Sequence, residues 1–276
     1  MLYLAHIPAA PLRRLVRLLW YTRMPPLDHR RQRILPSGCA QVILSFSRDF
    51  LLDCPEGLPE QFTAPALVVG QRSAYEIIDT SDLADLMGIV FAPGVLSLIV
   101  GDRADVFSNR SVGLEQVWGG QGRTLRDRLR EVSSPQDRLQ YLEQFLLARL
   151  APRLDQSSFA LHPAVEFALR RFEQAPAVTT VSDVASDTGW SNRRFSQIFR
   201  EQVGFAPKTW CRLARFQRAV RQLHAGLAIP WAEVAVECGF YDQAHCANEF
   251  RAFSGIDIRT YRSNRNPLWA NHVRAD

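Results

Sequence analysis

The sequence predicts an α+β N-terminal domain, a small antiparallel sheet plus a helix pair, followed by an all-α C-terminal domain of two helix-turn-helix units joined by a long helix. Three patterns carry this prediction. The first part of the chain has short apolar runs between turn residues. Apolar residues then recur with the spacing of a helix, and further along the chain one motif occurs twice. We expect an N-terminal sensor or dimerisation domain at residues 1–150, a linker at 151–160, a helix-turn-helix domain at 161–265 and a tail at 266–276.

The first part of the chain holds four runs that are typical of strands. Each is rich in large apolar residues and is bounded by Gly, Pro or Ser. The connections between them are too short for crossover helices, so we expect an antiparallel meander. After the last run, Pro93 and Gly94 open a helix. The expected strands are residues 41–46, 66–70, 75–78 and 86–91.

A helical period begins at Gly122. Leu125 and Leu129 start one apolar stripe, and residues 139–150 carry a second, with a turn at 133–135 between them. This spacing predicts an antiparallel helix pair. The stripes can pack inward or against a second copy of the chain, so a homodimer through this pair is left open. The Gly-rich segment 119–122 lacks the Lys and Ser/Thr of a phosphate-binding loop, and we interpret it as a plain loop.

One motif occurs twice between Thr180 and Arg262. Gly189 of the first copy corresponds to Gly239 of the second at an offset of 50 residues, and Gly204 corresponds to Gly255 at an offset of 51. One residue has therefore been added in the turn of the second copy. A repeat of this length indicates that one structural unit has been duplicated.

Each copy has the pattern of a helix, a glycine turn and a second helix. Thr180 and Asp183 form a capping-box-like start, and Gly189 supplies the left-handed residue that ends the first helix. Ser191 and Asp242 then cap the second helices, which the helix-turn-helix motif places in the DNA major groove. A connecting helix from 207 to about 224 would be ~27 Å long. That length suits two recognition helices on successive major-groove faces, which recur about every 34 Å.

The outer faces of the two second helices carry the candidate DNA-binding residues. Arg193 can donate two hydrogen bonds to guanine, and the amide side chains suit adenine. Arg200 and Arg251 lie toward the helix flanks and suit phosphate oxygens. On a single helix such residues would more often be merely solvated, but the duplicated motif favours recognition. The candidates are Asn192, Arg193, Ser196, Gln197, Arg200, Gln243, His245, Asn248 and Arg251.

The composition fits a DNA-binding protein and argues against several other classes. Net charge is +5 with a pI near 9.2. Lys208 is the one lysine, and residues 161–276 hold 15 Arg and Lys against 11 Asp and Glu, which favours phosphate contact. Five cysteines without a C-x-x-C pair argue against disulfides and zinc. With no run of 18 apolar residues, we expect a cytoplasmic protein with no metal, no cofactor and no membrane contact.

Residues 161–262 resemble the C-terminal DNA-binding domain of the AraC/XylS transcriptional regulators. The resemblance rests on the duplication, on Gly-Phe-Tyr-Asp-Gln-x-His at 239–245, on Phe-Arg-x-Phe-x-Gly at 250–255, and on Tyr261 and Arg262. It implies a transcription regulator that has RNA polymerase as a partner. In this family activation of transcription is commoner than repression. It also implies that Arg215 anchors the two units to each other.

Three positions depart from that family pattern. Cys246 stands where Phe is usual, Asn248 where Arg is frequent, and Ile258 where Pro is usual. The N-terminal part resembles a poorly characterised sensor-like domain found ahead of such DNA-binding domains, with Ser37 in place of the usual Asp. That resemblance implies the pairing of the two domains and does not name a ligand.

These patterns together predict a sequence-specific transcription factor, an activator that responds to an effector or partner through its N-terminal domain. We expect no enzymatic activity and no catalytic residue, because the sequence lacks H-E-x-x-H, G-x-S-x-G and G-x-x-x-x-G-K-[ST]. Two alternatives stay open. One is an interaction protein with a degenerate DNA-binding domain, and the other is a DNA-repair protein with a reactive cysteine at Cys39 or Cys54.

Overall fold

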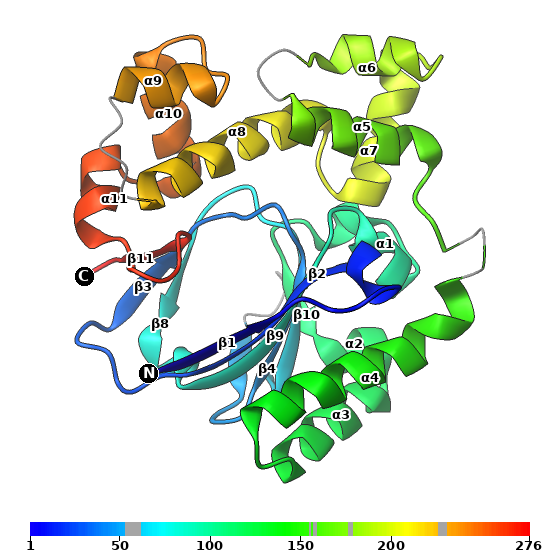
Figure 1. Ribbon diagram of the computed structural model, residues 1–276, viewed down its shortest axis with the longest axis vertical. Helices are drawn as coiled ribbons and strands as arrows, with labels where there is room; N and C mark the ends of the chain where they lie inside the picture. Colours follow the sequence, from blue (N-terminus) through cyan, green and yellow to red (C-terminus); the bar gives the residue numbers. More distant parts are fainter. Residues whose placement is uncertain (53–61, 155, 157–158, 176–178, 226–230) are drawn as a thin grey trace.

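A six-stranded antiparallel sheet forms the centre of the N-terminal domain (Figure 1). The computed structural model describes residues 1–52, 62–154, 156, 159–175, 179–225 and 231–276. The four expected strands are all present, but the one expected at 75–78, β8 (Glu76–Asp79), lies in a separate three-stranded sheet, so the four do not form the expected meander. The strands, in sheet order, are β1 (Leu2–His6), β2 (Val16–Arg23), β9 (Asp85–Phe91), β4 (Gln41–Ser45), β7 (Ala66–Val69) and β10 (Ser111–Gly113).

Strand β2 was not expected from the sequence, although it is an interior strand that pairs with the edge strand β1 on one side and with β9 on the other. Val16, Leu19 and Tyr21 are fully buried, whereas Arg17 lies in a bulge between Val16 and Leu18 and Arg23 is exposed at the end of the strand. The bulge breaks the two-residue alternation that would otherwise mark a strand in the sequence. A short hairpin of β5 (Phe50–Leu52) and β6 (Phe62–Ala64) stands apart from this sheet.

The expected helix pair consists of α3 (Gly120–Glu131) and α4 (Pro135–Leu154), which cover the sheet together with α2 (Leu114–Trp118) (Figure 1). Leu125, Leu129, Leu142 and Leu146 are fully buried in the core beneath the sheet. The buried residues of the two apolar stripes therefore pack inward. The interpretation of 119–122 as a plain loop was wrong, because α3 already begins at Gly120 and only Gly119 lies in a turn.

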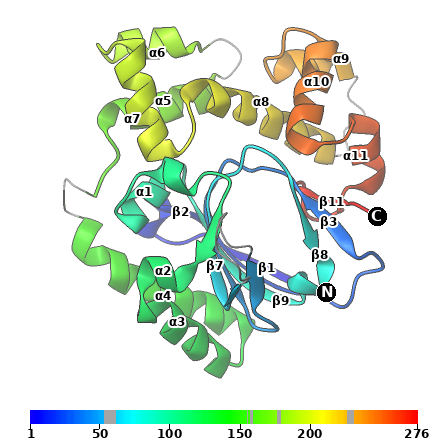
Figure 2. The same ribbon diagram turned by 180° about the vertical axis from the view of Figure 1, so that it is seen from behind.

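The C-terminal domain has the expected all-α architecture. The connecting helix α8 (Pro207–His224) carries one helix-turn-helix unit at each end (Figure 2). Thr180 Oγ1 caps the first unit by accepting from the Asp183 amide at 3.1 Å. The other helices are α5 (Pro163–Gln174), α6 (Val181–Asp187), α7 (Asn192–Val203), α9 (Trp231–Glu237), α10 (Gln243–Ser254) and α11 (Ile258–Asn264).

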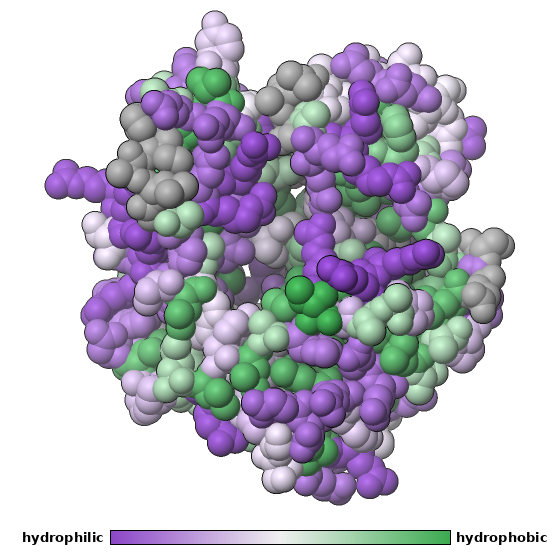
Figure 3. Space-filling view, viewed as in Figure 1, coloured by the Kyte–Doolittle hydropathy of each residue, from purple (hydrophilic) through white to green (hydrophobic). Residues whose placement is uncertain are grey.

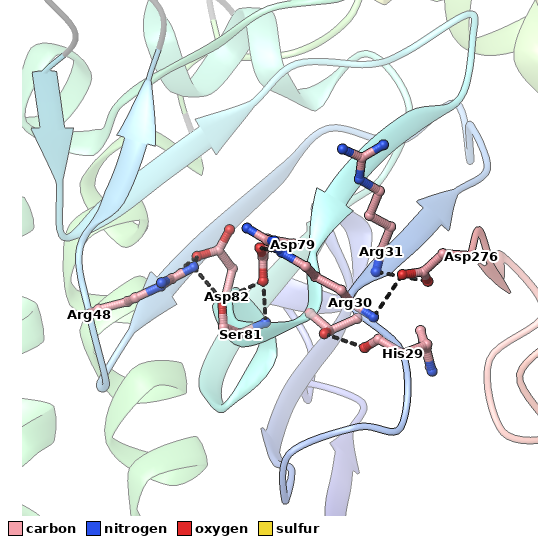
Figure 4. A network of polar contacts seen from close by, with 9 residues as sticks. His29, Arg30, Arg31, Arg48, Asp79, Ser81, Asp82 and Asp276 are labelled. Atoms are coloured by element: carbon pink, nitrogen blue, oxygen red, sulfur yellow. Dashed lines mark hydrogen bonds and ion pairs between the residues drawn. The ribbon is translucent and has the colours of Figure 1, made fainter.

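The residues expected to form a tail instead return to the N-terminal domain. Strand β11 (His272–Arg274) pairs antiparallel with β3 (Arg31–Ile34), which in turn pairs with β8 (Glu76–Asp79). The Asp276 carboxylate accepts from the backbone amides of Arg30 and Arg31, each at 3.0 Å, as Figure 4 shows. The pairing joins segments about 240 residues apart, so no local pattern could reveal it.

The two domains also share a hydrophobic core around α8. Leu35 of the N-terminal domain packs with Leu213 and Phe216 of α8 and with Val273 of β11, and all four are buried. Gln217, a buried polar residue of α8, donates to the Pro36 carbonyl at 2.6 Å and to Asn271 Oδ1 at 3.0 Å. The domains are therefore packed against each other rather than merely linked.

We predict that acidification weakens the joint formed by β11. Burial lowers the pKa of His272 from 6.5 to about 4. Because the folded pKa lies below the unfolded one, the neutral ring favours folding. This contribution is present above about pH 6.5 and is lost as pH falls toward 4. As pH falls through this window, the thermal midpoint of the wild type should therefore decrease more than that of His272→Gln. Parallel curves would contradict the prediction.

Candidate nucleic-acid interface

The second helix of each unit, α7 or α10, is fixed by a cap at its start and a glycine at its end. Ser191 Oγ accepts from the Arg194 amide at 3.3 Å, and Asp242 Oδ1 accepts from the His245 amide at 2.7 Å. Gly204 and Gly255 end the two helices in the left-handed conformation, with φ of 96° and 70°. Equivalent residues of the duplicated motif thus have equivalent backbone roles.

Helix α7 presents its predicted base-reading residues on one open face. Phe195 and Phe199 are fully buried against the rest of the first unit, which turns the polar face outward. Gln197 Nε2 donates to Glu201 Oε1 at 3.1 Å, a contact that solvent can replace. Of the five predicted residues on α7, Ser196 is partly buried and the exposed ones are Asn192, Arg193, Gln197 and Arg200.

Helix α10 likewise presents Gln243, Asn248 and Arg251 to solvent. The fourth predicted residue, His245, is only partly exposed and makes local contacts. Its Nδ1 accepts from the Tyr241 amide at 3.3 Å, and its ring stands edge-on to Phe240 with centroids 5.6 Å apart. The structure thus gives His245 a role in shaping the turn before α10.

Arg200, predicted to contact phosphate, pairs with an acid of the N-terminal domain. Its Nε lies 3.2 Å from Asp105 Oδ2, in the short 3-10 helix η3 (Ala104–Phe107). Arg103 hydrogen-bonds the same carboxylate and lowers its pKa below the usual range. Arg103 also lies 3.5 Å from Glu201. The C-terminal end of α7 is therefore docked on the N-terminal domain by charged groups.

Tyr241 was missing from the predicted set, although it is the most exposed large hydrophobic residue at this interface, with 90% of its surface accessible. It immediately precedes the Asp242 cap of α10. It is also the residue that the second copy has gained relative to the first, because Trp190 corresponds to Phe240. The one-residue insertion in the sequence could therefore have indicated an additional surface contact at this position. Its hydroxyl can reach phosphate or sugar oxygens.

A bidentate ion pair holds the second recognition helix to the connecting helix. Arg212 of α8 donates to both carboxylate oxygens of Glu249 in α10, at 2.7 and 2.8 Å. This hydrogen bonding lowers the pKa of Glu249. The guanidinium of Arg215, expected to be an anchor, lies 5.9 Å from the ring centroid of Phe240 in the same unit. Arg212 makes the stronger link, because a bidentate guanidinium pair is both charged and directional.

The departures from the family pattern are accommodated without a break in the second unit. Cys246 is fully buried with Ala219, Val234 and Phe240, and burial raises the pKa of its thiol to about 12. At the start of α11, Asp257 Oδ1 accepts from the Thr260 amide at 2.9 Å. This cap starts the helix where the family has a proline.

A cavity of about 480 Å³ lies between α8 and the N-terminal domain. Its charged lining is Arg17, Arg218, Arg221 and Glu173, with apolar walls from Phe172 and Trp210. The indole Nε1 of Trp210 is buried without a hydrogen-bond partner among the described residues. In Figure 3, hydrophilic residues gather over the two helix-turn-helix units at the top, and apolar residues are more frequent over the N-terminal domain below them.

Two further observations bear on alternative functions. Within the described residues, no group of His, Cys, Asp and Glu side chains is arranged to hold a metal ion. The same part of the chain has no helix that is both long and apolar enough to cross a membrane. Cys39 is buried, and burial raises the pKa of its thiol, whereas Cys54 lies outside the described residues.

We predict that Arg193→Ala weakens binding to the preferred DNA sequence by about 1–3 kcal/mol and relaxes the preference at one base position. The neighbouring Arg194→Ala is the matched control. Its guanidinium lies over the Trp190 ring at 5.0 Å, so we expect its loss to weaken all sequences alike. Competition binding with single-base variants of the site measures both effects. Uniform weakening by Arg193→Ala would contradict the assignment.

We predict that Asp105→Asn strengthens DNA binding and makes it more salt-dependent. Removing this charge frees Arg200 for a phosphate, and each added phosphate contact steepens the slope of log K against log salt by about 0.9. The control is Asp102→Asn, which removes a nearby acid whose Oδ1 accepts from the Arg103 amide. An equal change in both variants would show a general effect of net charge.

Comparison with known proteins agrees with this geometry. Residues 184–264 match the family described as helix-turn-helix domain, and residues 4–113 match the domain of unknown function DUF6597. No curated protein matches the chain. The C-terminal match is of the AraC type and covers both units found in the structure.

Several solved structures are similar to the chain. The DNA-binding domain of AdpA, a global transcriptional factor solved in complex with a target DNA, is 29% identical. The match covers 37% of this chain and 90% of that one, with a TM-score of 0.34. The C-terminal domain of AraT, a response regulator from Geobacillus stearothermophilus, is 21% identical over 37% and 86%, with a TM-score of 0.35. ToxT from Vibrio cholerae O395 is 11% identical over 89% and 92%, with a TM-score of 0.41.

Proposed function

We propose that this chain, a DNA-binding transcription regulator with an AraC-type domain of two helix-turn-helix units, activates transcription in response to an effector or partner. One observation carries the proposal: two equivalent recognition helices, α7 and α10, present polar faces from opposite ends of a single rigid helix. Such an arrangement reads two half-sites with one chain. The AdpA structure, which contains a related domain on its target DNA, supports double-stranded DNA as the partner.

The division of labour follows the two parts of the chain. Residues 161–265 bind DNA through the nine predicted residues, with Tyr241 added to them. Residues 1–150 act as the sensor domain, and the segment 151–160 links the two. RNA polymerase is the protein partner in this proposal. The regulator works without chemistry of its own, by changing how the recognition helices are presented to DNA.

The cavity beside α8 is the effector site in this proposal. Three arginines line it against a single glutamate, so its lining favours a small anion with an apolar part. Because the cavity is bounded by both domains, a ligand there contacts the sensor domain and the connecting helix together. Effector binding therefore has a direct physical route to the DNA-binding units.

The decisive experiment is selection of bound sequences from random duplex DNA with the full-length protein. We expect a motif with two half-sites about one helical turn apart. Repeating the selection with a small-molecule extract of cells tests the effector, and Ala214→Trp, which fills the cavity wall, should abolish any response to the extract. Absence of an enriched motif in both selections would favour an interaction protein instead.

A repair enzyme has less support from the geometry. Group transfer to a cysteine requires an accessible thiolate, whereas Cys39 is buried with a raised pKa. Arg17 Nη1 donates to its sulfur at 3.5 Å, within the packed joint between the domains. Mass spectrometry after exposure to alkylated DNA would detect transfer to either N-terminal cysteine, and we expect none.

A further inference from the structure

Both recognition helices end against the same short segment of the N-terminal domain. The segment is the loop of residues 70–75, which joins β7 to β8 and is called the bracing loop below. Gly204 ends α7 and Gly255 ends α10, and the duplication makes these two glycines equivalent. One loop therefore meets the same structural position in both copies of the motif.

The first contact lies at the end of α7. Gln71 is buried, with 2% of its surface exposed, and its side-chain amide packs so closely on Gly204 that a Cβ there would overlap it. Gln71 Nε2 donates to Ser108 Oγ at 3.1 Å, and Ser108 Oγ donates to the Gly204 carbonyl at 2.7 Å. A continuous chain of hydrogen bonds thus joins the bracing loop to the helix end.

The second contact lies at the end of α10. The Tyr75 amide donates to the Phe253 carbonyl at 3.1 Å, and Arg33 Nη1 donates to the Ser254 carbonyl at 3.0 Å. The Arg33 guanidinium also stacks on the Tyr75 ring at 4.1 Å, and that ring leaves no room for a side chain at Gly255. A guanidinium at a helix C-terminus is favourable, because it meets the negative end of the helix dipole.

The loop between these contacts is held in place along its length. The Gln71 carbonyl accepts from the Asn109 amide at 2.9 Å, and Asn109 Oδ1 accepts from the Ser73 amide at 2.8 Å. Arg72 donates to Glu76 and to Ser111 Oγ, each at 2.9 Å. Four residue steps separate Gln71 from Tyr75, a reach of at most ~14 Å. The loop is therefore a short and well-anchored connection.

We propose that the bracing loop, with Arg33 and Ser108, fixes the separation and angle of the two recognition helices and so determines which half-site spacing the protein accepts. This inference rests on the proposed function. Helix α8 packs against the two units at different points along its length, so by itself it would leave them some freedom to pivot relative to each other. The second connection through the N-terminal domain closes a ring of contacts and removes that freedom, which pre-organises the pair for one spacing.

The positions of the contacts allow bracing and DNA reading at the same time. The three donors that reach the helices belong to Ser108, Tyr75 and Arg33, and each acts on a backbone carbonyl at the C-terminal end of α7 or α10. The candidate base readers Arg193 and Gln243 lie in the first turns of those helices and are exposed. The brace therefore acts on the geometry of the pair without covering the reading faces.

The test uses the full chain and duplexes that carry the two selected half-sites at the preferred spacing or displaced by one or two base pairs. The variants are Ser108→Ala for the first contact and Arg33→Ala with Tyr75→Ala for the second. Arg30→Ala is the matched control, because Arg30 precedes the same strand and pairs with Asp79 instead. We expect both brace variants to lose about tenfold of the discrimination between spacings, within the range that a single mismatch costs. Affinity for an isolated half-site should stay within twofold.

The outcomes separate the brace from the proposed function. An unchanged spacing profile in both variants, with thermal midpoints near that of the wild type, would overturn the brace and leave the regulator intact. Failure of the wild type to select any sequence would overturn the proposed function and the brace with it. Ser108→Ala removes only one hydroxyl, so it keeps the test decisive if the double variant does not fold.

Discussion

The packing of α8 against both helix-turn-helix units and the N-terminal domain is the constraint on which the rest of the structure depends. Its residues supply core contacts to the first unit through Trp210, to the second through Ala219, and to the N-terminal domain through Leu213. A helix with so many partners has little freedom to bend or rotate. The position of α8 determines where the two units lie, and the contacts of the ends of α7 and α10 with the N-terminal domain add to this constraint.

Polar contacts of α8 add directional links to those that the apolar core makes. Gln217 ties α8 to the N-terminal domain, and Arg212 ties α8 to α10 with a directional ion pair. Buried polar groups of this kind are costly when unpaired, so their partners are specified closely. The joint between the domains is thus selective in geometry as well as tightly packed. A structural change on either side of this joint would therefore alter the position of the recognition helices.

The ion pair between Arg200 and Asp105 adds an electrostatic contact between α7 and the N-terminal domain. Arg200 of α7 pairs with Asp105 of the N-terminal domain, and in the proposed function DNA phosphate would compete with this carboxylate for the same guanidinium. The N-terminal domain therefore both supports the end of α7 and competes for one of its charges. In the proposed function, a small displacement of the short 3-10 helix that carries Asp105 would be enough to release Arg200.

The sequence by itself determined the local structure of this protein, including the caps at Thr180, Ser191 and Asp242, the duplicated helix-turn-helix pattern and the long helix from Pro207. These features depend on residues a few positions apart, where periodicity and capping are directly readable. Only the tertiary structure decided that β11 joins β3, that β2 pairs between β1 and β9, and that the loop at 70–75 meets both helix ends. Those contacts join segments far apart in the chain, and their partners are selected by packing and by pairing of backbone groups that every residue possesses.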